Sequence, residues 1–235
     1  MIDSFGRFAP DAVLAYWDGA GDETAPRTLV RGDDAIEKLL RETGVASYQN
    51  KIEVAGVSSR FVEGTLRRHD EQASTTFVTS ATLHPSGLVA RVLMFHSSLV
   101  EPPDAPRGVR MLPPDATAAV VSRYLAHLVA GELADAVACF SPDCLYSHPP
   151  YAPGGARVAF RGREALLAGF DGVRGPRRSR PRVLWAGQHG ANGFVEGVVE
   201  GAEGPKGSFV SSVQLEAQGL IKRYVAFYTA TRVPA

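Results

Sequence analysis

Several features of membrane and secreted proteins are missing from this sequence. The 235 residues contain only two cysteines, and 25 basic residues balance 25 acidic ones, so the formal net charge is zero. No apolar run approaches the roughly 20 residues that a membrane-spanning helix needs. The N-terminus shows no charged segment followed by an apolar core, the pattern of a secretion signal. We therefore expect a cytoplasmic protein that binds neither membranes nor nucleic acids.

Metal and nucleotide motifs are missing as well. The sequence has no CxxC, HExxH, GxGxxG or P-loop pattern, and its six histidines lack the spacing of metal ligands. We expect no metal and no cofactor. Cys139 and Cys144 are five residues apart at a helix-to-strand junction, which favours free buried thiols over a disulfide. The loop at 172–182, GVRGPRRSRPR, carries five arginines. It is either a solvated loop or a binding site for an anionic ligand such as an acyl-carrier phosphate.

The chain contains an internal duplication. Residues 77–102 align without a gap on residues 209–234, with nine identities in 26 positions. Upstream, Phe8-Ala-Pro-Asp matches Phe140-Ser-Pro-Asp, and Phe61-Val-Glu-Gly matches Phe194-Val-Glu-Gly, at a nearly constant offset. This period is too long for a solenoid. The sequence therefore predicts two domains, at 1–102 and 115–235, joined by a proline-rich linker at 103–114.

Each copy is expected to hold a helix and several long antiparallel strands. The predicted strands are 51–57, 59–68, 74–83 and 88–99, with 181–188, 193–200, 207–216 and 220–232 in the second copy. The segments His84–Gly87 and Glu216–Gly219 are predicted hairpin turns. Only the second copy has a long helix before its first strand. The fold class is thus α+β, with a first domain that lacks its N-terminal helix.

The segment from Asp115 to Pro150 is the most informative stretch. Asp115 is a plausible N-cap, and Gly131 marks a turn. Between them, helical spacing of apolar residues predicts an amphipathic helix that presents Tyr124, with Ala119, Val120, His127, Leu128 and Ala130 on the same face. After the turn residues Ser-Pro-Asp at 141–143, a strand is expected to carry His148. A helix bearing Tyr124 is therefore predicted beside a strand bearing His148.

This pattern resembles the cone-shaped α+β family of nuclear transport factor 2, ketosteroid isomerase, scytalone dehydratase, limonene epoxide hydrolase and the SnoaL-type polyketide cyclases. The matching segments are 119–143, the RGREAL run at 161–166 and the closing GLIKRYVAFY at 219–228. The resemblance places Tyr124 at the family's oxyanion-stabilising tyrosine and His148 at its proton-shuttling aspartate. The family's second acidic donor falls on Ser211. Because a histidine and a serine replace two acids, the resemblance implies the fold more firmly than any one reaction.

From this resemblance we expect a cyclase or isomerase of secondary metabolism that acts on an aromatic or polycyclic carbonyl compound. Histidine is a suitable general base near neutral pH, and a buried phenol can stabilise an enolate. The candidate catalytic residues are His148 and Tyr124. The candidate substrate-binding residues are Tyr146, Trp185, Ser211, Tyr224, Ala226 and Tyr228.

The first copy offers a weaker set of candidates. Tyr16 corresponds to His148, Glu53 corresponds to Trp185, and His96 faces the expected cavity. A pair formed by Asp18 and Glu53 would resemble the two carboxylates of the epoxide hydrolases with this fold, which protonate the epoxide and activate the attacking nucleophile. Two alternatives to the cyclase or isomerase thus stay open: an epoxide hydrolase of polyether-type biosynthesis, and a non-catalytic binding or scaffolding protein. The first copy is expected to act as a pseudo-subunit in an intramolecular pseudo-dimer, and a homo-oligomer is also compatible with the sequence.

Overall fold

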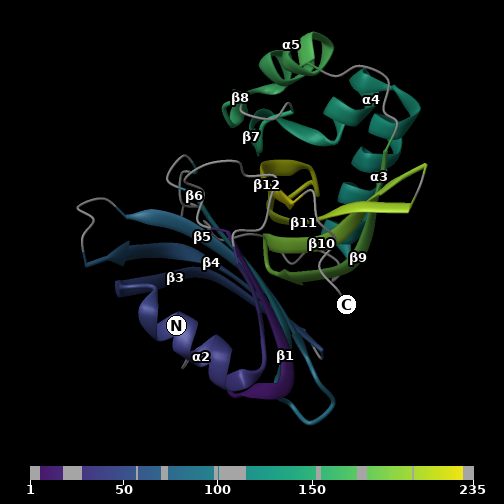
Figure 1. The fold of residues 1–235 in the computed structure, drawn as a ribbon. Coiled ribbons are helices and arrows are strands. Elements are labelled where there is room, and N and C mark those ends of the chain that lie inside the picture. Colours follow the sequence, from purple (N-terminus) through teal and green to yellow (C-terminus); the bar gives the residue numbers. More distant parts are fainter. Residues whose placement is uncertain are drawn as a thin grey trace. The chain divides into compact units, whose positions relative to one another are not determined.

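The computed structural model describes residues 6–17, 28–56, 58–69, 74–97, 100, 115–151, 155–173, 179–202 and 204–229, apart from the side chains at 46, 173 and 205. The chain divides into two compact units, Met1–Ala105 with Pro234–Ala235 and Pro106–Val233 (Figure 1). The predicted linker at 103–114 and the candidate Asp18 lie outside the described residues. The predicted domain boundaries therefore stay predictions.

The first unit is a six-stranded sheet with one described helix. Its strands run in the order β2-β1-β6-β5-β4-β3, and all neighbours are antiparallel except β1 and β6, which are parallel. The elements are β1 (Phe8–Trp17), β2 (Thr28–Arg31), α2 (Asp33–Glu42), β3 (Val45–Ala55), β4 (Ser59–Arg68), β5 (Thr75–Leu83) and β6 (Val89–Ser97).

The second unit repeats this topology. Its order is β8-β7-β12-β11-β10-β9, again with a parallel pair, β7 and β12, formed by the first and last strands. The elements are α3 (Ala116–Ala130), α4 (Leu133–Ala138), β7 (Phe140–His148), β8 (Val158–Arg161), α5 (Arg163–Val173), β9 (Arg180–His189), β10 (Asn192–Gly201), β11 (Gly204–Leu215) and β12 (Ile221–Thr229). The predicted α+β class and the tandem architecture are confirmed, although the parallel pair makes each sheet mixed rather than purely antiparallel.

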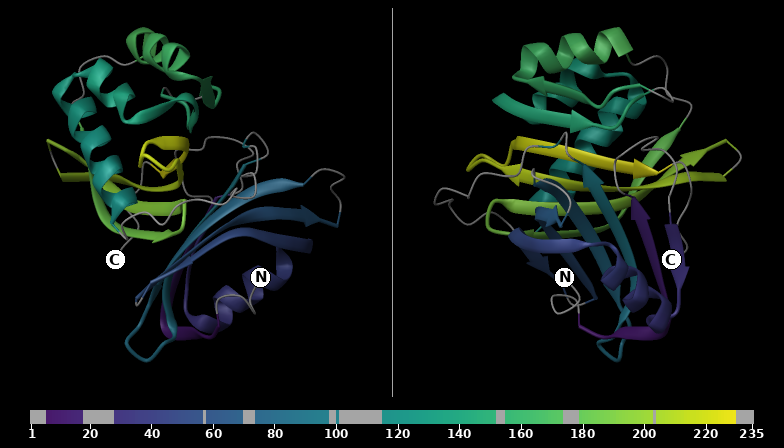
Figure 2. Two further views of the ribbon diagram at one scale, coloured as in Figure 1. Left: turned by 180° about the vertical axis from the view of Figure 1, so that it is seen from behind. Right: turned by 60° about the vertical axis from the view of Figure 1, so that its left-hand side comes forward.

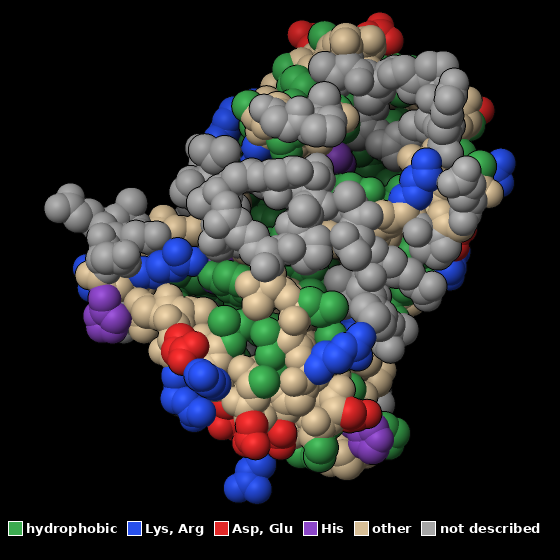
Figure 3. All heavy atoms as spheres, viewed as in Figure 1, with side chains coloured by type: hydrophobic (Ala, Val, Ile, Leu, Met, Phe, Trp, Pro, Cys, Tyr) green, Lys and Arg blue, Asp and Glu red, His purple; other side chains and the backbone are tan. Residues whose placement is uncertain are grey.

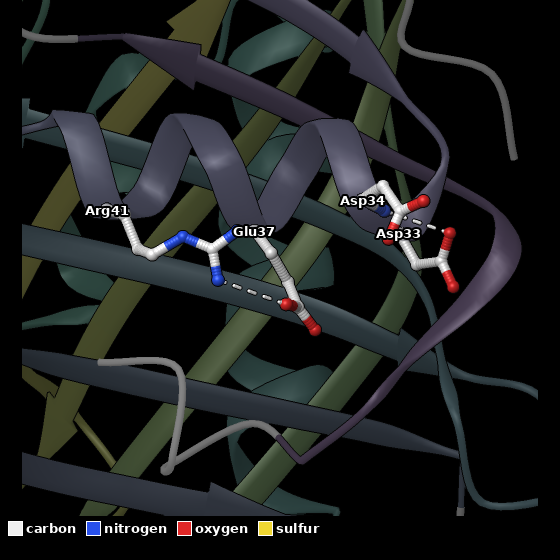
Figure 4. Close-up of polar contacts among 4 residues, drawn as sticks. All are labelled: Asp33, Asp34, Glu37 and Arg41. Carbon is white, nitrogen blue, oxygen red and sulfur yellow. Dashed lines mark hydrogen bonds and ion pairs between the residues drawn. The ribbon is translucent and has the colours of Figure 1, made fainter.

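Helix α2 is stabilised locally at both ends. Gly32 precedes it with a φ of 88°, a conformation that glycine adopts without strain. Asp33 and Asp34 occupy the first turn, where negative charge suits the helix dipole. Glu37 and Arg41 form an ion pair one turn apart at 3.4 Å (Figure 4), worth about 0.3 kcal/mol. Acidic and basic side chains intermix over this helix in Figure 3, so its outer face is solvated.

Helix α3 has no counterpart ahead of β1 among the described residues. It ends where Gly131 adopts a left-handed φ of 80° and its N–H bonds back to the last turn. The buried residues are Thr117, Val120, Val121, Tyr124, Leu125 and Leu128. The predicted face was thus partly wrong: Ala119 and Ala130 are exposed. The helix packs on β9 and β10, as the left view in Figure 2 shows. The buried face is rotated around the helix relative to the predicted one, since it includes Thr117, Val121 and Leu125 and leaves out Ala119 and Ala130.

Both predicted hairpin turns are present. The N–H of Gly87 donates to the carbonyl of His84 at 2.8 Å, and the N–H of Gly219 donates to that of Glu216 at 2.9 Å. Both glycines have positive φ angles, 82° and 77°, as such turns require. The predicted turn at Ser141–Asp143 instead lies inside β7, which begins at Phe140. There the pairing of β7 with β12 shifts register, so the proline is accommodated in a bulge.

The Phe-Val-Glu-Gly motif has the same surroundings in both units. Its glycines, Gly64 and Gly197, each lie opposite a register shift in the neighbouring edge strand, β3 or β9. A Cβ atom at Gly64 would lie 2.2 Å from the carbonyl oxygen of Gln49, and one at Gly197 would lie 2.3 Å from that of Arg182. The two bulges therefore require glycine at these positions.

No helix among the described residues is long and apolar enough to cross a membrane.

Candidate functional site

The second unit contains a small cavity between α3 and the inner face of its sheet. The volume that the centre of a water molecule can occupy is about 50 Å³. Residues from five elements and the end of β7 form the wall, and most of them are apolar. They are Tyr124, Leu125, His148, Pro181, Val199, Phe209, Tyr224, Ala226 and Tyr228. The two predicted catalytic residues thus lie on one cavity, together with three of the predicted substrate-binding residues.

His148 is held at the end of β7. Its Nδ1 lies 2.7 Å from the carbonyl oxygen of Pro149. Because a carbonyl oxygen only accepts hydrogen bonds, Nδ1 carries a proton, and the neutral ring has its lone pair at Nε2. The ring stacks on Tyr151, with centroids 4.7 Å apart, and is half-buried. The ring orientation is therefore fixed on two sides.

Tyr124 belongs to a row of three phenols. Its hydroxyl donates to that of Tyr146 at 3.4 Å, and the Tyr146 hydroxyl lies 3.2 Å from that of Tyr151. Tyr124 and Tyr146 are almost fully buried. Tyr146 does not line the cavity; it lies behind the wall and stacks on Tyr224 at 5.6 Å. The row connects the interior with the loop that follows His148.

The remaining predicted residues of the second unit have different roles in the structure. Ser211 is buried and donates to the Tyr224 hydroxyl at 2.9 Å, so it orients a tyrosine of the wall. Tyr228 also lies on the wall, and burial raises the pKa of its phenol. Trp185 pairs directly with Glu196 and is not among the described residues that line the cavity.

The first unit has a polar cluster at the equivalent place. Arg68 donates to the Tyr16 hydroxyl at 2.7 Å, and that hydroxyl lies 3.2 Å from Nδ1 of His96. Tyr16 on β1 is the repeat position of His148 on β7, and His96 on β6 is that of Tyr228 on β12. The two units therefore carry a histidine and a tyrosine on the same two strands, with the residue types exchanged.

The carboxylate pair predicted for the first unit cannot be assembled from the described residues. Glu53 is exposed and forms an ion pair with Arg60 at 3.5 Å, and Asp18 lies outside the described range.

Burial makes His96 a source of acid sensitivity. Its pKa is lowered from 6.5 to about 3, first by burial and then by the charge of Arg68. Between these values the unfolded chain binds a proton that the folded protein excludes. The stabilisation is therefore complete above pH 6.5 and is lost as the pH falls toward 3, by up to about 1.4 kcal/mol per pH unit. Denaturant unfolding of His96→Gln between pH 7 and 5 should show a shallower decline than the wild type. His189→Gln, which changes an exposed histidine, is the control, and identical slopes in the wild type and His96→Gln would contradict this assignment.

One surface cluster has the composition of a metal site. His127, Glu132 and Asp135 offer three ligand atoms within 4.8 Å of one another. However, Nδ1 of His127 is already 2.6 Å from a Glu132 carboxylate oxygen, and a histidine in the last turn of α3 also suits the helix dipole. These contacts explain the cluster without an ion.

The two free thiols, Cys139 and Cys144, are buried, and burial raises the pKa of Cys144.

Sequence reasoning did not identify several residues of the site. Tyr151 stacks on His148 and ends the row of phenols, although it is only three residues beyond His148 in the run Tyr-Ser-His-Pro-Pro-Tyr. Arg157 donates to the Ser147 hydroxyl at 3.1 Å and to the Ala226 carbonyl at 2.9 Å, which braces β7 and β12. The wall residues Leu125, Pro181, Val199 and Phe209 could not be told apart in the sequence from residues of an ordinary hydrophobic core.

Comparison with known proteins finds a family match in the second unit. Residues 121–229 match the family described as "SnoaL-like domain". No curated protein matches the chain. Similar solved structures include a provisionally named ketosteroid isomerase from Kribbella flavida, with 17% identity over 52% of this chain and 84% of that one and a TM-score of 0.40. A provisionally named polyketide cyclase from Sinorhizobium meliloti has 20% identity over 49% of this chain and 94% of that one, with a TM-score of 0.37. An NTF2-like protein of unknown function from Burkholderia xenovorans has 15% identity over 52% of this chain and 88% of that one, with a TM-score of 0.40.

Proposed function

We propose that the second unit, whose residues 121–229 match the SnoaL-like domain family, is a cofactor-independent cyclase or isomerase. Its substrate is an apolar, polyketide-like compound with an acidic proton next to a carbonyl group. The single observation that carries the proposal is the shared cavity of His148 and Tyr124. One is a nitrogen base and the other a phenol donor, and they come from separate elements, β7 and α3. Base and donor facing one apolar space are the groups that enolisation requires.

The proposed reaction begins with a proton transfer. Nε2 of His148 takes the proton from the carbon next to the carbonyl, the electron pair of the broken C–H bond forms a C=C bond, and the π pair of the C=O bond moves onto the carbonyl oxygen. The Tyr124 hydroxyl donates a hydrogen bond to that oxygen as its negative charge develops. The imidazolium can return the proton to another carbon, which completes an isomerisation. Alternatively, the enolate carbon attacks a second carbonyl of the same molecule, and the imidazolium protonates the new alkoxide, which completes a cyclisation.

The row of phenols supports the role of Tyr124. When the Tyr124 proton is directed at a substrate oxygen, the Tyr146 hydroxyl can turn and donate to Tyr124, and Tyr151 can donate to Tyr146. Each hydroxyl then polarises the next one, which strengthens the final hydrogen bond to the substrate. No charged group is needed in the cavity for this effect.

A non-catalytic binding or scaffolding protein is the second candidate, and the small cavity favours a scaffold, which needs no space for a ligand. A free space of about 50 Å³ holds little more than a water molecule or two, so a polycyclic ligand requires movement of the tyrosine walls. An epoxide hydrolase is not supported, because the described wall of the cavity contains no carboxylate to activate water or protonate an epoxide.

Hydrogen–deuterium exchange tests the proposal without knowledge of the natural substrate. The bicyclic ketone 2-tetralone in D₂O, followed by proton NMR, reports removal of the proton next to its carbonyl. We expect the wild-type protein to accelerate exchange and Tyr124→Phe to slow the catalysed part about 100-fold, because one oxyanion donor is lost. Tyr48→Phe, which changes a half-buried tyrosine of the first unit, is the control. A Tyr124→Phe variant that exchanges at the wild-type rate would leave the binding protein as the better proposal.

A further inference from the structure

A second hollow adjoins the cavity on the outside of the second unit. It is an open groove of about 460 Å³ between the outer side of α3 and β9. Its floor is formed by short and apolar side chains, among them Ala126, Val129 and Val183, and Arg180 and Arg182 also line it.

The groove and the cavity share part of their walls. Leu125 and Pro181 line both of them. Leu125 lies one residue beyond Tyr124 on α3, and Pro181 lies between the two arginines on β9. Leu125 and Pro181 therefore separate the cavity from the groove, and a molecule that extends from one to the other has to pass between them.

Glu200 lies directly opposite Arg180 in the pairing of β10 with β9, so one carboxylate stands next to the two arginines of the groove. No acidic side chain lines it in the described part of the chain. Arg182 has a partner, since its Nε donates to Glu200 at 2.9 Å. Arg180 lies at the start of β9 with an exposed side chain. An anionic group in the groove gains the attraction of Arg180, whereas a neutral group gains only contact with the apolar floor.

We propose that the substrate of the second unit is an elongated molecule with two unlike ends. Its apolar, carbonyl-bearing end enters the cavity, and its anionic end, a carboxylate or a phosphate, lies in the groove beside Arg180. The inference rests on the proposed function for the identity of the inner end. The assignment of the outer end rests on the groove, with its apolar floor and its arginines. Arg180 is therefore a specificity-determining residue rather than a catalytic one.

Two fluorescent probes that share a ring system test this inference. 8-Anilino-1-naphthalenesulfonate is anionic, and N-phenyl-1-naphthylamine is its neutral counterpart. In a fluorescence titration at low ionic strength, Arg180→Gln should weaken binding of the anionic probe about three- to tenfold and leave the neutral probe unchanged. Added salt should reduce that difference. Lys38→Gln, which removes an exposed positive charge from α2, should change neither probe.

A second variant tests the groove itself. Ala126 is exposed on the groove side of α3, so Ala126→Trp should fill the groove and weaken both probes. Competition then identifies the anionic end. Stronger displacement of the anionic probe by 1-naphthoate than by 1-naphthyl phosphate would assign a carboxylate, and the reverse would assign a phosphate. If neither displaces it better than neutral 1-naphthol, the inference is overturned.

Equal affinities of the wild type and Arg180→Gln for the anionic probe would also overturn it. These titrations do not depend on catalysis. Failure of 2-tetralone exchange alongside Arg180-dependent binding would remove the proposed reaction and keep the anionic subsite. If 2-tetralone exchange is normal but binding of the anionic probe does not depend on Arg180, the proposed reaction stands and the anionic subsite is removed.

Discussion

Replacement of His148 by alanine is expected to slow catalysed proton exchange of 2-tetralone by roughly 10²–10⁴-fold, the usual contribution of a positioned general base. The expectation follows from the geometry of the ring. Nδ1 is committed to the Pro149 carbonyl, so the base is Nε2. No other imidazole or carboxylate lines the described wall of the cavity, so no neighbouring group can replace it.

Chemical rescue distinguishes a lost base from a damaged fold. Imidazole added to His148→Ala should restore part of the exchange rate, with a dependence on imidazole concentration that saturates if the molecule occupies the vacated space. His189→Ala, which changes an exposed histidine at the end of β9, should exchange at the wild-type rate. Undiminished exchange by a folded His148→Ala protein would rule out the assignment.

Gly197→Ala is expected to lower the free energy of unfolding of the second unit by about 3 kcal/mol. The added methyl group would lie 2.3 Å from the Arg182 carbonyl oxygen and 2.5 Å from the Phe209 ring. The carbonyl belongs to the backbone of a bulge in β9, so it cannot move away without breaking strand pairing, and overpacking of this kind is costly. Denaturant unfolding followed by far-UV circular dichroism measures the change.

Gly172→Ala is the matched control for this prediction. Gly172 is exposed in the last turn of α5, and an added Cβ there meets nothing within 4 Å. The same substitution should therefore stabilise the protein slightly, by about 0.5 kcal/mol, through helix propensity. Gly64→Ala should destabilise the first unit in the same way as Gly197→Ala does the second. If Gly197→Ala and Gly172→Ala unfold at the same denaturant concentration, the bulge does not require glycine.

The architecture could be predicted from the sequence because the chain contains two copies of the same pattern of strands and turns. Two copies of the same strand-and-turn pattern constrained each other, and the turns at Gly87 and Gly219 followed from their glycines. The short strands β2 and β8 were missed, since four residues show too little alternation to stand out. The parallel pairing of the first and last strands depends on the path of the chain rather than on any local pattern.

The candidate site was predicted less completely, for local reasons. Tyr224, Ala226 and Tyr228 alternate along β12, and the structure places all three on one wall. The same alternation fails in β9, where Val183 pairs with Gly197 but Trp185 pairs with Glu196. Residues directly opposite each other share a face, so the bulge between them turns Trp185 toward the side of Glu196, away from the cavity. A single extra residue cannot be located from periodicity alone.

The pairing of first with last strands also governs how the protein is made. In the first unit Tyr16 and His96 meet across 80 positions of the chain, and the second unit repeats this connection with β7 and β12. On the ribosome, β7 has no neighbour on that side until residues 221–229 have been synthesised. Each half therefore completes its sheet only after its final strand emerges, and contacts this distant in sequence form slowly. Until then the growing chain carries open strand edges, the state in which chaperones are most useful to a nascent protein.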